Sequence, residues 1–193
     1  MAGVALAASM GCKISKEGHG EDKKVSIDVP GASIKVDKGL AANDSGIPLY
    51  PAAEQKPGSE NESHRAHVSL NTPFVSLKVV KLEYLSKDSP EKVLAYYRDK
   101  LSTYGAVVEC KGGADDIEIG YNSKDGKKRN LQSPVDCTHS SGKKDGTTLK
   151  VGTQGNAHVV EVRPNGQGTE FSLVYVYVGN GKDEEDYSGK QPS

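Results

Sequence analysis

The chain has 193 residues and a nearly balanced charge, with 25 Lys or Arg residues against 26 Asp or Glu residues. Strongly basic surfaces hold nucleic acids and anionic membranes, so we expect no nucleic-acid partner for this chain. Hydrophobic residues make up 35% of the sequence. Every apolar run is shorter than the roughly 18 residues that a membrane-spanning helix needs.

An apolar stretch of small residues, Met1 to Gly11, opens the chain and is followed at Cys12 by a polar segment. This pattern is typical of the end of a signal peptide. The block from Ser9 to Cys12 resembles a bacterial lipobox, whose cysteine is acylated and becomes the new amino terminus. Ser9 stands where leucine is usual, and no basic residue precedes the apolar stretch. We expect export with a lipid anchor on Cys12; the alternative is a cytosolic amino terminus with a buried cysteine.

Two further cysteines, Cys110 and Cys137, remain for a disulfide, and an exported chain tends to pair them. Cys110 ends a strand-like apolar run, whereas Cys137 lies in a polar stretch, so the bridge would fasten a long loop to a sheet. Because the disulfide would lower the conformational entropy of the unfolded chain, we expect it to stabilise the fold by about 3 kcal/mol. The alternative is two free thiols in a reducing compartment.

An internal repeat relates residues 25–38 to residues 68–81, where Val, Ser, Pro, Ser, Lys, Val and Lys recur at the same places. Both copies alternate apolar and polar residues around a proline, which favours a bent strand or a short hairpin. We expect the copies to pair with each other in one sheet. The apolar residues expected to face its core are Val25, Ile27, Ile34, Val36, Val68, Leu70, Leu77 and Val79.

One helix is expected over about 89–104. Ser89 is suited to the N-cap, Pro90 to the first helical position and Gly105 to the left-handed residue after the last turn. One stripe at helical spacing carries apolar residues that should lie on the sheet. They are Val93, Leu94, Tyr97, Leu101 and Tyr104.

Further strands are predicted after this helix, at 106–110, 117–121, 148–152, 157–163 and 170–179. Asn165-Gly166 is a strong hairpin signal between the last two. The last strand is apolar on both faces, so we expect it to be central, with the helix on one side.

Polar segments separate these elements. The loop over 39–67 offers only three residues suited to burial, Ile47, Leu49 and Tyr50. Residues 122–146 are polar, with Cys137 as their expected anchor. The tail from Asn180 to Ser193 has the composition of a disordered segment.

Two short motifs carry a resemblance to a family. The helix segment Asp88 to Arg98, followed by Tyr104-Gly105, resembles the pattern "SPEKV..FYR..L..YG" of uncharacterised secreted or lipid-anchored bacterial proteins, in which antiparallel strands follow the helix. Residues 46–53, GIPLYPAA, resemble their "GxPxYPGA" segment, with Ala52 at the place of the commoner glycine. The resemblance implies an envelope location and no particular catalytic residues.

Four groups of polar side chains could in principle carry chemistry, but each is better explained as a solvated or structural feature. The groups are His64 and His67 with Glu60 or Glu62, Cys137 with His139, the acidic residues Asp115, Asp116 and Glu118, and the basic residues Lys124, Lys127, Lys128 and Arg129 with Lys143 and Lys144. Phosphate-loop, dinucleotide and nucleophile-elbow motifs are missing from the sequence. We therefore expect no catalytic, metal or cofactor site.

The sequence thus predicts an α+β fold, mainly antiparallel sheet with one long amphipathic helix. Residues 1–23 would be a signal-peptide remnant and polar linker, 24–179 a single domain and 180–193 a disordered tail. We expect an exported, lipid-anchored protein of the outer membrane, periplasm or cell surface that acts by binding or scaffolding. Its membrane contact would be the lipid anchor only, and a protein or envelope polymer its partner. Self-assembly by strand addition, with homo-oligomers, and a secreted enzyme with an unrecognised site remain as alternatives.

Overall fold

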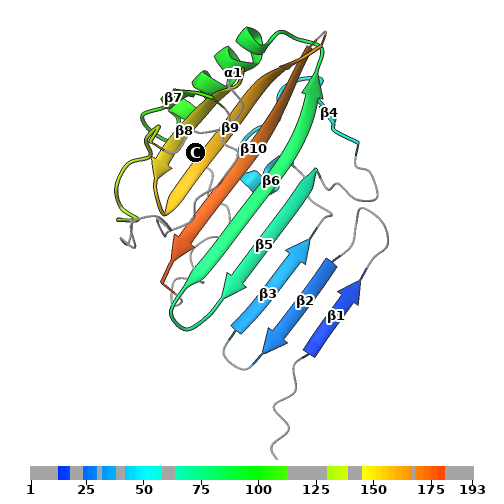
Figure 1. Ribbon diagram of the computed structural model, residues 1–193, viewed down its shortest axis with the longest axis vertical. Coiled ribbons are helices and arrows are strands. Elements are labelled where there is room, and N and C mark those ends of the chain that lie inside the picture. The colour runs from blue at the N-terminus through cyan, green and yellow to red at the C-terminus, as the bar shows by residue number, and fades with distance from the viewer. Residues whose placement is uncertain are drawn as a thin grey trace, which may run out of the picture.

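The computed structural model describes residues 13–17, 24–29, 32–37, 42–57, 64–112, 130–138, 145–166 and 168–180. These residues form one antiparallel sheet of ten strands with one α-helix packed on one face (Figure 1). The strands are β1 (Lys13–Glu17), β2 (Lys24–Val29), β3 (Ala32–Asp37), β4 (Glu54–Gln55), β5 (Arg65–Asn71), β6 (Ser76–Ser86), β7 (Val108–Lys111), β8 (Thr147–Thr153), β9 (Asn156–Asn165) and β10 (Gly168–Gly179). The helix is α1 (Pro90–Ser102), and a short 3-10 helix, η2, covers Ala42–Ser45.

The strands lie in the order β1-β2-β3-β5-β6-β10-β9-β8-β7, and β4 pairs with β6 off this path (Figure 1). The expected class, α+β with a mainly antiparallel sheet and a helix, is therefore confirmed. β10 is central, between β6 and β9, and the Asn165-Gly166 turn joins it to β9. The first strand, β1, lies in a segment that was predicted to be a linker.

The helix α1 is shorter than expected. It begins at Pro90, after Ser89 in extended conformation, and ends at Ser102. Beyond that point the N–H groups of Tyr104 and Gly105 donate to carbonyls three residues back. These bonds form a turn that is tighter than an α-helix and ends it. Gly105 then has a φ of 137°.

The core lies between α1 and one face of β6, β8, β9 and β10. Alternate residues of these strands point to the helix, as the period of a strand requires. From α1 the buried residues are Val93, Leu94, Tyr97 and Leu101, and from the sheet they are Val80, Leu82, Tyr84, Leu149, Val151, Val160, Val162, Phe171, Leu173 and Tyr175. With 13 residues, the one α-helix of the described chain is not long and apolar enough to cross a membrane.

Tyrosines of the helix region hold residues 46–53 against the core. The hydroxyl of Tyr104 donates to the carbonyl of Gly46, and that of Tyr96 donates to the carbonyl of Leu49 at 3.0 Å. The Tyr97 hydroxyl accepts the N–H of Tyr50 at 3.1 Å. Ile47 and Tyr50 are buried as expected, but Leu49 is exposed. The two motifs that carried the family resemblance thus contact each other directly.

Each copy of the repeat forms a hairpin, β2–β3 for the first and β5–β6 for the second. The hairpins are neighbours because β3 pairs with β5, which sets Ile34 opposite Leu70. Their apolar residues do share one face, but the expectation that this face is the core is wrong. On β6 it is Val80, Leu82 and Tyr84 that belong to the core, whereas Leu77 and Val79 lie on the opposite face. Two-residue alternation fixes which side chains share a face, not which face the helix covers.

Candidate functional site

A disulfide fastens the loop 130–138 to the sheet. Cys110 of β7 is joined to Cys137, the pair expected from the sequence, with Cα atoms 5.4 Å apart. Cys110 is buried, and so is Val135 of the loop. The loop therefore lies against β7 and β8 at the edge of the sheet.

Backbone hydrogen bonds tie the same loop to the turn between β8 and β9. The N–H of Gly155 donates to the carbonyl of Leu131 at 2.8 Å, and the N–H of Gln154 donates to the carbonyl of Ser133 at 2.8 Å. On the other side of the turn, the N–H of Val178 donates to the carbonyl of Gly155 at 2.7 Å. Loop, turn and β10 thus form one hydrogen-bonded frame.

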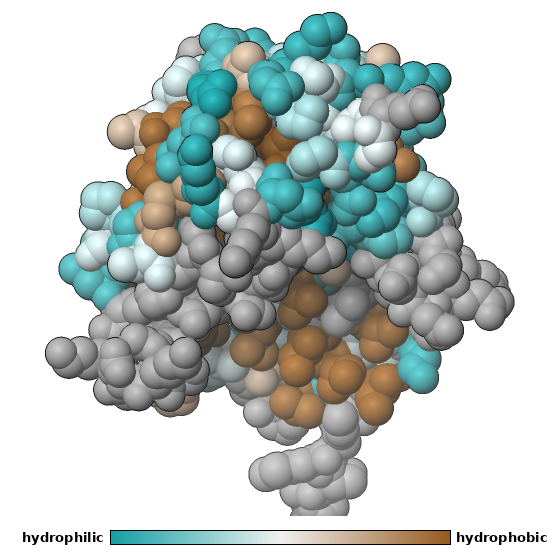
Figure 2. Space-filling view, turned by 45° about the horizontal axis from the view of Figure 1, so that its top comes forward, coloured by the Kyte–Doolittle hydropathy of each residue, from teal (hydrophilic) through white to brown (hydrophobic). Residues whose placement is uncertain are grey.

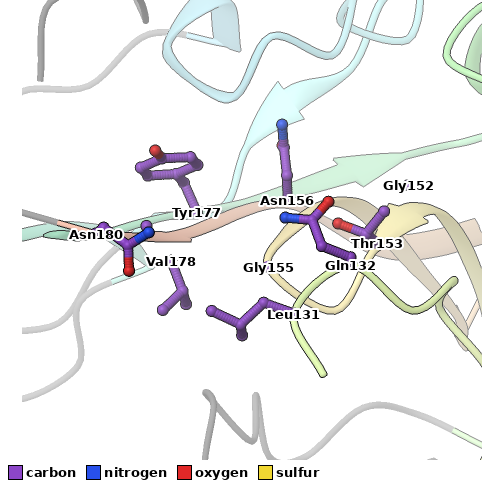
Figure 3. Close-up of a pocket in the computed structure, with 10 residues that line it drawn as sticks. Leu131, Gln132, Gly152, Thr153, Gly155, Asn156, Tyr177, Val178 and Asn180 are labelled. Carbon is purple, nitrogen blue, oxygen red and sulfur yellow. The ribbon is translucent and has the colours of Figure 1, made fainter. Parts of the chain in front are cut away.

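A pocket of about 370 Å³ opens within this frame. We call it the turn pocket. Its described lining residues come from the loop (Leu131, Gln132), the β8–β9 turn (Gly152, Thr153, Gly155, Asn156) and the end of β10 (Tyr177 to Asn180). Figure 3 shows Leu131 and Val178 side by side on one side of β10, and Tyr177 and Asn156 on the other.

The chemistry of the turn pocket is polar and uncharged. Side-chain amides come from Gln132, Asn156 and Asn180, and a hydroxyl comes from Thr153. Gly155 allows the close approach of loop and turn, because a Cβ there would lie 2.8 Å from the Cβ of Leu131. No pattern in the sequence singles out these residues. The local signal was Gly155 between two predicted strands, which indicates a turn but no pocket.

A second cluster, the ion-pair strip, lies on the face opposite α1 at one end of β6, β10 and β9. Glu170 accepts from Lys56 and Arg163 at 3.0 Å each, and Glu83 lies 2.8 Å from Lys81. Glu161, buried beside Ser172, extends the strip on β9. Carboxylates and cations alternate here, so their charges offset one another.

Electrostatics within the strip keep Glu83 ionised. Burial raises the pKa of Glu83, but the ammonium of Lys81, the hydrogen bond from His64 and the charge of Lys56 together outweigh burial and hold the pKa below its usual value. A carboxylate held in this form has little tendency to act as a proton donor near neutral pH. Glu83 is therefore held as a carboxylate by its neighbours in the ion-pair strip.

The two histidines weighed as metal ligands separate in the structure. The Nδ1 of His64 lies 2.6 Å from Glu83, and the Nε2 of His67 lies 2.9 Å from the hydroxyl of Ser69. Residues three apart along an extended chain point to opposite faces of the sheet. In the described part of the chain, His, Cys, Asp and Glu side chains form no group of three or more that could hold a metal ion.

His158 on β9 is enclosed by aromatic rings. Its ring centroid lies 4.4 Å from that of Tyr104 and 4.9 Å from that of Tyr175. Burial lowers the pKa of His158 to about 4, so the imidazole is neutral at physiological pH. His158 is therefore a half-buried, neutral imidazole packed against two tyrosine rings, beside the turn pocket in sequence but not among its lining residues.

An apolar surface occupies the rest of the face opposite α1. Successive strand pairs set Ile14, Ile27, Ile34, Leu70, Leu77 and Val178 opposite one another in one row across the sheet. We define the apolar half-face as Ile14, Val25, Ile27, Ile34, Val68, Leu70, Leu77 and Val79. Ile14 is 60% exposed and Ile34 is 38% exposed. Figure 2 shows a hydrophobic cluster in its lower half, below a hydrophilic region.

Several predicted residues lie outside the part of the chain that the structure describes. They are Met1 to Cys12 with the lipidation site, the strand expected over 117–121, the tail after Asn180, Glu60, Glu62, His139, and all members of the acidic and basic groups named above.

Comparison with protein-family models found no matching family, and searches of the curated proteins and of the solved structures found no match.

Proposed function

We propose that the protein is an exported envelope protein, held to a membrane by lipid on Cys12, that acts by binding or scaffolding. The observation that carries this proposal is the disulfide between Cys110 and Cys137. Such a bond is compatible with an extracellular or periplasmic location. Of the three cysteines of the chain, only Cys12 remains outside this disulfide.

The start of the sheet sets where the proposed lipid would be attached. β1 begins at Lys13, directly after Cys12. Acylation at Cys12 would therefore attach the lipid next to the edge strand, with no spacer between. The turn pocket and the apolar half-face supply two surfaces suited to binding.

The mass of the native amino-terminal peptide tests the proposal. We expect a peptide that begins at an acylated Cys12, and we expect Cys12→Ser to move the protein from the membrane fraction to the soluble fraction. The variants Cys110→Ser and Cys137→Ser serve as controls, because loss of either thiol should leave the protein in the membrane fraction. Recovery of an unmodified Met1 peptide from the cytosol would refute the proposal.

A second candidate function is self-assembly through the apolar half-face and β1. Among the described strands, β1 pairs only with β2, so its outer edge meets no described strand. An antiparallel pairing of two β1 strands centred on Ser15 sets Lys13 opposite Glu17 of the second copy at both ends. This register would join the sheets of two copies, with both apolar half-faces on the same side and Ile14 of each copy opposite Lys16 of the other. The occupant we assign to this edge is therefore a second copy of the chain.

Sedimentation at several protein concentrations tests this assembly. We expect a concentration-dependent dimer that the double variant Ile14→Ser/Ile34→Ser converts to a monomer. Phe74→Ser is the matched control, because Phe74 is 82% exposed in the β5–β6 turn, outside the half-face. A wild-type monomer at every concentration would exclude self-assembly, and a dimer that survives the double variant would exclude the apolar half-face as its interface.

A further inference from the structure

We propose that the turn pocket binds a neutral, polyhydroxylated ligand, one sugar unit either free or within an envelope polymer. This inference rests on the binding role proposed above, but it does not require the lipid anchor. Its volume of about 370 Å³ is in the range of small-ligand sites, about 300–1,000 Å³.

Hydrogen-bonding chemistry favours hydroxyl groups over ions. A sugar hydroxyl both donates and accepts, and a side-chain amide offers one acceptor oxygen and two donor hydrogens. Three residues with such amides, Gln132, Asn156 and Asn180, line the pocket, and Thr153 adds a hydroxyl. The described lining residues include no Lys, Arg, His, Asp or Glu. Nothing in this set would offset the charge of a phosphate or a carboxylate.

Apolar contact is available on one side of the pocket. Leu131 and Val178 lie side by side there (Figure 3). A pyranose ring carries C–H groups on its faces, and burying them against aliphatic side chains is favourable. The combination of apolar side and uncharged polar groups is the usual composition of a ligand pocket.

The pocket is also preorganised. The disulfide fixes the loop that carries Leu131 and Gln132, and the backbone bonds of Gly155 join loop, turn and β10. A ligand would therefore meet groups that are already in place, which lowers the entropic cost of binding.

Titration monitored by NMR tests the inference on the full chain carrying Cys12→Ser. This variant cannot be acylated, so its result is independent of the anchoring experiment. The probes are glucose, galactose, N-acetylglucosamine and chitotriose, with glucose 6-phosphate as a charged comparison. We expect saturable shifts of the amide signals of Gln132, Thr153 and Asn180, with a Kd of about 0.1–1 mM for at least one neutral sugar. Tighter binding of chitotriose than of N-acetylglucosamine would identify the polymer as the source; equal binding would identify the free sugar.

Variants complete the test. Gln132→Leu and Asn180→Leu should each weaken binding about tenfold, because each removes hydrogen bonds to the ligand. Gln55→Leu is the control, since Gln55 is an exposed amide on β4, outside the pocket. The inference is overturned if none of the neutral sugars shifts these signals, if both pocket variants bind as wild type, or if only glucose 6-phosphate binds.

Discussion

Ala52 has a φ of 56°, and it is the only described residue other than glycine with a positive φ. This left-handed conformation costs an L-residue with a Cβ about 1–2 kcal/mol. Position 52 is also where the resembling segment "GxPxYPGA" has glycine. The backbone therefore gives a physical reason for glycine at this place, and alanine is accommodated with strain.

Replacing Ala52 by glycine should stabilise the protein. Glycine relieves the steric cost but gives back about 0.5–1 kcal/mol of backbone entropy, so Ala52→Gly should raise the free energy of unfolding by about 0.5–1 kcal/mol. Urea denaturation measures the change. Ala95→Gly is the control: Ala95 is exposed within α1, and the same substitution there should cost about 1 kcal/mol. Equal losses at both positions would show that Ala52 is not strained.

His158 should make the protein less stable in acid. The pKa of His158 is about 4 in the folded protein and near 6.5 in the unfolded chain. Between these two pKa values the unfolded state binds one more proton than the folded state. The free energy of unfolding that neutral His158 contributes is therefore fully present above pH 6.5 and is lost as the pH falls toward 4. Each pKa unit corresponds to 1.36 kcal/mol, which gives a loss of about 3 kcal/mol.

Urea midpoints measured from pH 7 to pH 4 test this expectation. His158→Gln is the matched variant, because glutamine keeps a polar group of similar size but does not titrate in this range. We expect its midpoint to change much less over the same interval. An equally steep decline in wild type and variant would assign the acid sensitivity to other groups.

At the scale of elements, the sequence predicted the helix and most of the described strands, but it missed β1, β4 and the contacts between α1 and residues 46–53. N-cap, proline and glycine signals located the helix to within two residues at each end, and burial of Ile47 and Tyr50 was expected. The hydroxyl of Tyr104 could not be assigned from sequence, because its partner, the carbonyl of Gly46, is distant in the chain. Periodicity predicts burial of a ring, whereas a hydrogen bond between distant segments depends on their packing.

The disulfide should be a main support of the loop that forms the turn pocket. It closes a loop with a sequence separation of 27, for which the entropy model gives about 3–4 kcal/mol. The double variant Cys110→Ser/Cys137→Ser should therefore unfold at a lower urea concentration than wild type. Dithiothreitol is the internal control: it should lower the wild-type midpoint toward that of the variant and leave the variant unchanged. A wild-type midpoint insensitive to reduction would show that the bridge adds no stability.

At the scale of the whole molecule, the apolar residues change faces across the sheet. Under α1 they lie on one face of β6, β8, β9 and β10, whereas on β1, β2, β3, β5 and one end of β6 they lie on the other face, on the apolar half-face. Pairing of the repeat hairpins could be expected from their similarity. The change of face could not, because it depends on which part of the sheet the helix covers, and that is set by packing between distant segments.

Hydrogen exchange should separate these two parts of the sheet. The largest fully buried side chains belong to α1, β6, β8, β9, β10 and Ile47, and none of those in the described chain belongs to β1, β2 or β3. We expect the amides of β2 and β3 to exchange by openings that cost several kcal/mol less than global unfolding, and those of β6 and β10 to exchange only by global unfolding. Equal protection in all these strands, with the same dependence on denaturant, would contradict this expectation.

The strand order also sets a distance. β1 lies at one margin of the sheet, and six strand spacings separate it from β9 beside the turn pocket (Figure 1). Neighbouring strands lie about 4.8 Å apart, so the sheet spans about 29 Å between them. Hydrogen-bonded ladders join every strand between them. The fold therefore keeps the turn pocket at a fixed distance from β1, and any attachment made next to β1 would hold the pocket that far away.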